Sequence, residues 1–246
     1  MTTLVTLPGL DGSPYLQGAL PHALQQLPGM GAVEHRCLYY PPHQRMGYLE
    51  LARWAAPQLP QDRPFVLLGE SFGGPLALVL AGCGRGEAAM QPSPYLRGVV
   101  LAASFADCAV PWAAPALPLL QNAPASALYA VPQAVWAWWL LGRWASPVLL
   151  QSLKKSLQHT APTVLQHRAV QALQPPALDL AALAMPLLVL HPGQDRLIPP
   201  RCLQAFQAAP QCQIHTVDGP HMLLQTQAAA CAPLVAAFLQ GLDTDF

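Results

Sequence analysis

The sequence predicts an α/β protein with a mostly parallel, doubly wound sheet of about six strands and helices on both faces. Three observations indicate this class. Short apolar runs typical of buried strands alternate with longer stretches typical of helices along most of the 246 residues. Hydrophobic residues make up 53% of the chain, which suffices to cover both faces of a parallel sheet. A glycine-rich turn at residues 69–74 joins one apolar run directly to a helix-like stretch.

The alternation can be followed along the chain. Strands are predicted at residues 4–7, 34–40, 64–69, 97–103, 186–191 and 212–217. Helices are predicted at residues 14–26, 47–59, 72–82, 200–208 and 222–240. Because most strands are separated by a helix, the connections are crossovers and the strands run parallel. Functional loops of such a sheet gather at the carboxyl ends of its strands.

The first predicted strand, residues 4–7, leads into a glycine-bearing loop at residues 8–13, hereafter the first loop. Asp11 is a typical turn former, and Ser13 is expected to cap the helix at 14–26. Since the chain opens on this strand, the sheet is expected to lack an N-terminal antiparallel hairpin.

The most informative segment is Gly-Glu-Ser-Phe-Gly-Gly at residues 69–74, between the apolar run 64–68 and the helix-like run 75–81. A serine at a sharp turn from strand to helix has a strained backbone, and glycines two positions before and after it remove Cβ atoms that would collide. Its hydroxyl then projects above the sheet. Ser71 is therefore predicted to be a nucleophile, the alternative being a glycine-rich turn with an incidental serine.

A serine nucleophile needs a histidine to take its proton and a carboxylate to orient that histidine. Asp195 lies on the loop after the predicted strand 186–191. His221 lies after the predicted strand 212–217 and just before the C-terminal helix. The order Ser71, Asp195, His221 is the one used by α/β-hydrolases.

With these motifs the chain resembles the α/β-hydrolase superfamily over essentially all its length. The resemblance implies that Ser71, Asp195 and His221 are catalytic, and that the backbone N–H groups of Phe72 and Leu10 form the oxyanion hole. Some relatives place the acid after an earlier strand, which leaves Asp107 as an alternative. The first loop has Pro-Gly where many relatives carry His-Gly.

Residues 108–180 interrupt the alternation at the place where these proteins carry a helical lid. The predicted division is therefore a core of residues 1–107 and 181–246 with a lid insertion at 108–180. The lid holds five of the six tryptophans of the chain. Trp112, Trp136 and Trp139 are predicted to bind an apolar acyl chain, although tryptophans that only pack the lid's own helices would give the same pattern.

The lid also contains no Asp or Glu between residues 108 and 178, but four cations. These are Arg143, Lys154, Lys155 and Arg168. Such a cationic face is expected to suit an anionic acyl carrier, whereas an ordinary solvated surface is the other interpretation.

Composition excludes several classes of function. The 12 basic and 12 acidic residues balance, so the chain as a whole has no excess positive charge that would attract nucleic acid. Apolar runs are too short to span a bilayer, and no signal peptide is apparent. Six cysteines without metal-type spacing favour a reduced, cytoplasmic protein. No metal, cofactor or phosphate loop is expected, and the oligomeric state cannot be predicted.

The predicted function is ester hydrolysis through an acyl-enzyme on a small molecule with an apolar acyl part. One alternative is a thioesterase or methyl esterase that acts on acyl groups attached to a carrier protein. An alternative of another class is a ligand-binding protein on the same fold without catalysis.

Overall fold

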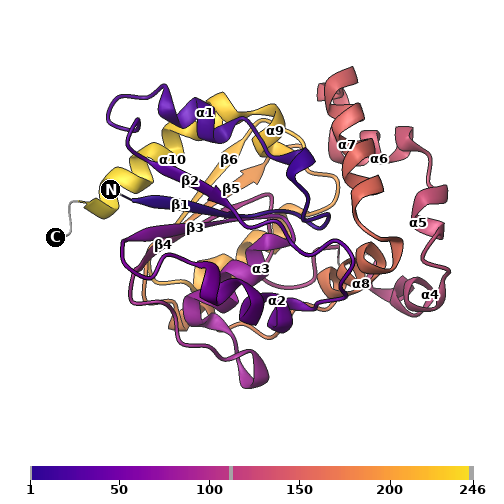
Figure 1. The fold of residues 1–246 in the computed structure, drawn as a ribbon, viewed down its shortest axis with the longest axis horizontal. Helices are drawn as coiled ribbons and strands as arrows, with labels where there is room; N and C mark the ends of the chain where they lie inside the picture. The colour runs from indigo at the N-terminus through magenta and orange to yellow at the C-terminus, as the bar shows by residue number, and fades with distance from the viewer. Residues whose placement is uncertain (1, 111–112, 244–246) are drawn as a thin grey trace.

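The computed structural model describes residues 2–110 and 113–243, and its centre is a six-stranded sheet (Figure 1). The strands are β1 (Thr3–Leu7), β2 (Glu34–Cys37), β3 (Phe65–Glu70), β4 (Leu96–Ala102), β5 (Leu187–Pro192) and β6 (Cys212–Val217). They lie in the order β2-β1-β3-β4-β5-β6, and all five pairings between them are parallel. The predicted fold class is thereby confirmed.

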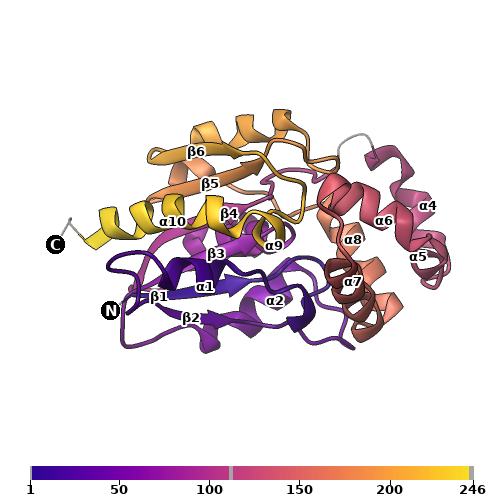
Figure 2. The same ribbon diagram turned by 90° about the horizontal axis from the view of Figure 1, so that it is seen from above.

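Helices cover both faces of the sheet (Figures 1 and 2). On one face lie α1 (Leu20–Gln25), α9 (Leu223–Thr226) and α10 (Ala228–Asp243), and on the other lie α2 (Tyr48–Ala55) and α3 (Gly73–Leu78). Within the described ranges, no helix combines the length and apolarity needed to cross a membrane.

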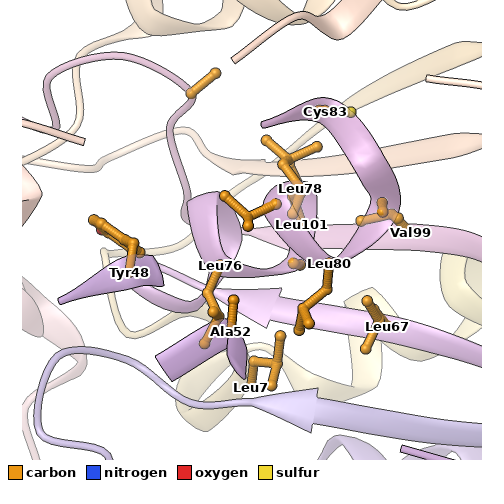
Figure 3. Close-up of a cluster of buried hydrophobic side chains, with 14 of the residues drawn as sticks. Leu7, Tyr48, Ala52, Leu67, Leu76, Leu78, Leu80, Cys83, Val99 and Leu101 are labelled. Atoms are coloured by element: carbon orange, nitrogen blue, oxygen red, sulfur yellow. The ribbon is translucent and has the colours of Figure 1, made fainter. Parts of the chain in front are cut away.

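Two hydrophobic clusters hold these layers to the sheet. Leu67, Val99 and Leu101 point from the strands towards α2 and α3, where they meet side chains such as Leu76 and Ala52 (Figure 3). On the opposite face, alternate strand residues meet α1 and α10. Both faces of β3 and β4 are therefore apolar, as expected for central strands of a parallel sheet.

Some predicted elements are shorter or broken. The helix predicted at 14–26 is instead a 3₁₀ turn at Pro14–Leu16 followed by α1. Between the two, the backbone at Gly18 passes close to Leu224, so that a Cβ on Gly18 would lie 2.5 Å from the Leu224 carbonyl oxygen. The strand predicted at 34–40 pairs only as far as Cys37. The helix at 200–208 is 3₁₀, and the predicted C-terminal helix is divided into α9 and α10 at the non-helical Gln227.

Between β4 and β5, at the carboxyl ends of the strands, lies a group of helices hereafter called the insert, residues 108–180 (Figure 2). It contains α4 (Leu117–Asn122), α5 (Ala127–Ala130), α6 (Gln133–Leu140), α7 (Pro147–His159) and α8 (Pro162–Leu173). These helices follow β4, where the lid was predicted, and the action of this group as a lid stays a prediction. Trp112, predicted to bind substrate, lies outside the described residues.

The turn between β3 and α3 packs closely against its neighbours. A Cβ at Gly69 would lie 2.6 Å from the carbonyl oxygen of Gly73, and a Cβ at Gly74 would overlap the Ser104 side chain. At Gly73 a Cβ would overlap the carbonyl oxygen of Leu7 in β1. Since this last obstacle is backbone, it cannot move aside as a side chain could.

Replacing Gly73 with alanine is therefore expected to destabilise the protein by about 3 kcal/mol or more, because the new methyl group forces α3 away from β1. Thermal unfolding followed by circular dichroism should show a midpoint lowered by roughly 10 °C.

Gly31→Ala is the matched control, because no atom lies within 4 Å of a Cβ at that position. Equal midpoints for the two variants would contradict this description of the turn.

Candidate active site

Ser71 lies at the tip of the turn between β3 and α3, with a left-handed φ of 50°. Non-glycine residues rarely adopt this conformation and the surroundings must enforce it. Its N–H donates to the carbonyl of Ala102 (2.9 Å), while its own carbonyl accepts from Gly74 N (3.0 Å) and from Ser104 Oγ (2.8 Å). These bonds use the backbone of Ser71 and leave its hydroxyl free to project from the turn.

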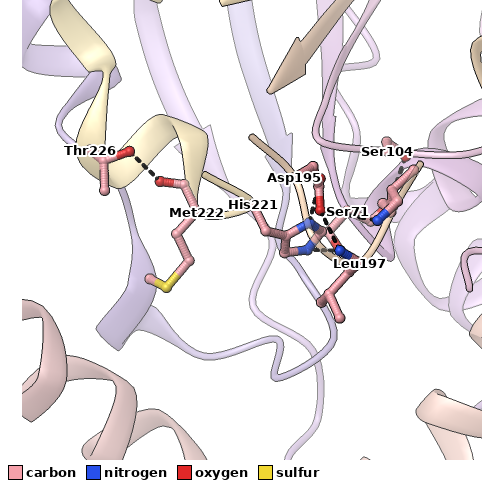
Figure 4. A network of polar contacts seen from close by, with 8 residues as sticks. Ser71, Ser104, Asp195, Leu197, His221, Met222 and Thr226 are labelled. Carbon is pink, nitrogen blue, oxygen red and sulfur yellow. Dashed lines mark hydrogen bonds and ion pairs between the residues drawn. The ribbon is translucent and has the colours of Figure 1, made fainter. Parts of the chain in front are cut away.

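Two loops from distant parts of the chain bring a histidine and a carboxylate to this hydroxyl (Figure 4). Ser71 Oγ lies 2.9 Å from His221 Nε2, and His221 Nδ1 lies 2.8 Å from Asp195 Oδ2. The other oxygen of Asp195 accepts from the N–H groups of Leu197 (2.8 Å) and Ile198 (3.0 Å), which fix the carboxylate. Asp107, the alternative acid, is exposed and has no such contact with His221.

Burial and charge act against each other in this pair. Burial lowers the pKa of His221, but the charge and hydrogen bond of Asp195 outweigh it, so the pKa lies above its ordinary value. Burial raises the pKa of Asp195, but His221 and the two backbone N–H groups hold it below its ordinary value. An ionised Asp195 keeps the imidazole proton on Nδ1, so Nε2 of neutral His221 can accept a proton from Ser71.

The first loop passes beside Ser71 and carries Leu10, one of the two predicted oxyanion donors. A Cβ at Gly9 would lie 3.9 Å from Ser71 Cβ, so the loop backbone runs close to the hydroxyl. The N–H groups of Leu10 and Phe72 donate to no acceptor within the described residues. Both amides are thus available to a ligand.

A buried arginine from the insert holds the first loop. Arg168 in α8 is 0% exposed, and its guanidinium donates to the carbonyls of Leu10 (3.1 Å), Asp11 (2.9 Å) and Pro41 (3.0 Å). Thr160 Oγ1 also donates to the Asp11 carbonyl (2.8 Å). The insert is therefore bonded to the loop that carries Leu10.

A cavity of about 450 Å³ opens at Ser71 and His221, within the range typical of small-molecule sites. Trp136 and Trp139 of α6 line it, as do leucines of α7 and α8. The two tryptophans also contact each other edge to face, with ring centroids 6.3 Å apart. These two tryptophans therefore pack against each other within the insert and also face the cavity.

Two of the four cations predicted to form a cationic face on the insert have partners in the core. Arg168 is buried, and Arg143 pairs with Asp218 of the core at 2.8 Å. Lys154 and Lys155 remain exposed on α7. The sequence could not show these partners, because Arg168 bonds to backbone carbonyls and Arg143 pairs with an aspartate far away in the chain.

Glu70 was assigned no role in the site from the sequence. It lines the same cavity as Ser71, and its Oε1 accepts a hydrogen bond from Gln225 Nε2 (2.8 Å). Strand alternation was a usable signal, since Glu70 must face the same side of the sheet as Leu68. Within the described ranges, no group of three His, Cys, Asp or Glu side chains could hold a metal ion.

Comparison with known proteins places this geometry in context. The sequence profile of the alpha/beta hydrolase family matches residues 4–234. Among curated proteins, none matches the chain.

Solved structures share the fold at low sequence identity. An esterase from Exiguobacterium antarcticum is similar with a TM-score of 0.72 and 13% identity, covering 98% of this chain and 92% of that one. A hydrolase from Oleispira antarctica has a TM-score of 0.71 and 16% identity, covering 98% and 91%. A thermophilic esterase from Thermogutta terrifontis has a TM-score of 0.68 and 18% identity, covering 98% and 89%.

The contacts of Arg168 predict a specific cost of removing it. Arg168→Met leaves the carbonyls of Leu10 and Pro41 without this donor and the Asp11 carbonyl with Thr160 alone, and we expect a loss of about 3 kcal/mol in the free energy of unfolding. Chemical denaturation with urea measures this loss.

Arg143→Met is the matched control, since an exposed ion pair contributes at most about 1 kcal/mol. If both variants lost the same stability, the guanidinium of Arg168 would not be holding the first loop.

Proposed function

The chain belongs to the alpha/beta hydrolase family, and on that basis we propose that it is a serine hydrolase that cleaves carboxylic esters through an acyl-enzyme. The observation that carries the proposal is the continuous hydrogen-bonded series from Ser71 through His221 to Asp195, at the mouth of an apolar cavity. A binding protein without catalysis has no need of this series, which disfavours that alternative.

The proposed reaction starts when Ser71 Oγ attacks the ester carbonyl carbon and His221 Nε2 takes the hydroxyl proton. Asp195 orients the imidazole and stabilises the imidazolium that forms. The N–H groups of Phe72 and Leu10 are proposed to stabilise the negative oxygen of the tetrahedral intermediate. His221 then gives its proton to the departing alcohol. In the second half, His221 Nε2 takes a proton from water as its oxygen attacks the acyl carbon, and returns that proton to Ser71 Oγ as the carboxylic acid leaves.

The apolar wall of the cavity supports an acyl group as the guest. The side chains of Trp136, Trp139, Leu153 and Leu165 line the part of the cavity formed by the insert. Burying a methylene group there contributes about 0.8 kcal/mol, so longer acyl chains should bind better until the cavity is full.

Hydrolysis of carrier-bound thioesters or methyl esters is less well supported. It requires an anionic protein to dock beside the entrance, but of the predicted cationic face Arg168 is buried and Arg143, although exposed, already pairs with Asp218. We therefore favour a small-molecule ester.

A series of p-nitrophenyl esters from acetate to decanoate tests the proposal. We expect kcat/KM to rise with acyl length to an optimum and then fall. Ser71→Ala should lower kcat by about 10⁴-fold or more, because the covalent route is lost.

Ser152→Ala, on α7, is the control for a serine outside the site and should retain wild-type rates. Hydrolysis that survives in Ser71→Ala would exclude this serine as the nucleophile, and absence of turnover across the series would favour the binding-protein alternative.

A further inference from the structure

The mainly apolar cavity at Ser71 is also lined by polar side chains that ester cleavage and acyl binding leave unassigned. Besides Ser71 and His221, most of the polar side chains on its wall come from the core, whereas the insert contributes Ser156 of α7. Asp11 and Ser13 of the first loop bond to each other, and the other six are Thr6, Gln17, His35, Tyr39, Glu70 and Gln225, hereafter the polar arm. The rest of the wall that the insert supplies is mainly apolar.

Strand register brings part of the polar arm together. His35 pairs with Leu4, two residues before Thr6, and Leu68 precedes Glu70 by two residues. Since alternate residues share a face, Thr6, His35 and Glu70 project from the face of the sheet that α1 and α10 cover. On β1, β3 and β4 the neighbouring side chains of this face, such as Leu4, Leu68 and Val100, are apolar, and the polar ones lie towards the carboxyl ends of β1 and β3.

Hydrogen bonds fix the outer part of the polar arm. Thr6 Oγ1 lies 2.9 Å from His35 Nε2, and Tyr39 Oη donates to Gln17 Oε1 (2.7 Å). Gln17 Nε2 lies 3.4 Å from His35 Nδ1, which joins the two pairs. Gln17 and Tyr39 are exposed, so this end of the polar arm is open to solvent.

Glu70 forms the inner end, directly before the nucleophile in sequence. Its one hydrogen-bond donor within the described residues is Gln225, and no Lys or Arg there pairs with it. Burial raises the pKa of Glu70 to about 7, against the smaller lowering by Gln225. A carboxyl group placed in a cavity without a cation offers a ligand an acceptor for hydroxyl hydrogens.

We propose that the polar arm binds the alcohol part of the ester, and that this alcohol carries further hydroxyl groups, as in a glycerol or glycol ester. Glu70 accepts a hydrogen bond from one such hydroxyl, and the exposed end at Gln17 and Tyr39 gives the released polyol a route to solvent. The proposal rests on the proposed ester hydrolysis at Ser71.

Two butyrate esters that differ only in hydroxyl groups test this specificity. 1-Monobutyrylglycerol and n-propyl butyrate share the acyl group and a three-carbon alcohol. We expect the wild type to prefer the glycerol ester by about tenfold or more in kcat/KM, since a hydrogen bond to a charged or partly charged acceptor contributes at this scale. The measurement is proton release in a pH-stat.

Glu70→Leu should bring the ratio of the two kcat/KM values close to one, and Glu70→Gln, which keeps an acceptor oxygen, should retain part of it. Using a ratio removes any effect of Glu70 on His221, because both esters depend equally on that histidine. If Glu70→Leu does not fold, Gln17→Leu at the exposed end should lower the ratio severalfold, with Gln158→Leu on the exposed side of α7 as its control.

A wild-type ratio near one, or a preference that survives in Glu70→Leu, overturns the proposal. So does hydrolysis of p-nitrophenyl butyrate through Ser71 without hydrolysis of the glycerol ester. Failure of the proposed function is a different result, in which neither these esters nor the p-nitrophenyl series are cleaved.

Discussion

The close packing of the turn between β3 and α3 is the constraint on which the site depends. Gly73 approaches the Leu7 carbonyl and Gly74 approaches Ser104 so closely that neither position has room for a Cβ. The same packing holds Ser71 at a φ of 50°, which directs its hydroxyl to His221. The unfavourable backbone conformation of Ser71 is thus maintained by the close contacts of Gly73 and Gly74.

The second requirement is a stable position for the first loop, and here the insert contributes more than a wall for the cavity. Arg168 and Thr160 both bond the carbonyl of Asp11, next to the Leu10 amide proposed to bind the oxyanion. Burying this guanidinium is costly, since the charge of Asp11 offsets the loss of hydration only in part and the pKa of Arg168 lies below its ordinary value. Through Arg168, the insert that lines the cavity is bonded to the first loop, which carries the proposed oxyanion donor Leu10.

The strand alternation and the order of Ser71, Asp195 and His221 made the fold and the three groups at its centre predictable from the sequence, because each follows from a local pattern and the rules of parallel sheets. Arg168 was not predictable in its actual position, since its partners are carbonyls 127 to 158 positions away, which have no sequence signature. Glu70 was predictable in principle from its position in β3. The break between α9 and α10 at Gln227 was not predictable, because the sequence around it reads as one continuous apolar helix.

Covalent labelling tests the central claim most directly, that Ser71 is a nucleophile activated by His221. The folded protein would be treated with a fluorophosphonate and the modified peptide identified by mass spectrometry. The account predicts a single adduct on Ser71, formed more slowly as falling pH protonates His221, and absent after heat denaturation. Labelling on another serine, or no labelling of the folded protein, would contradict it.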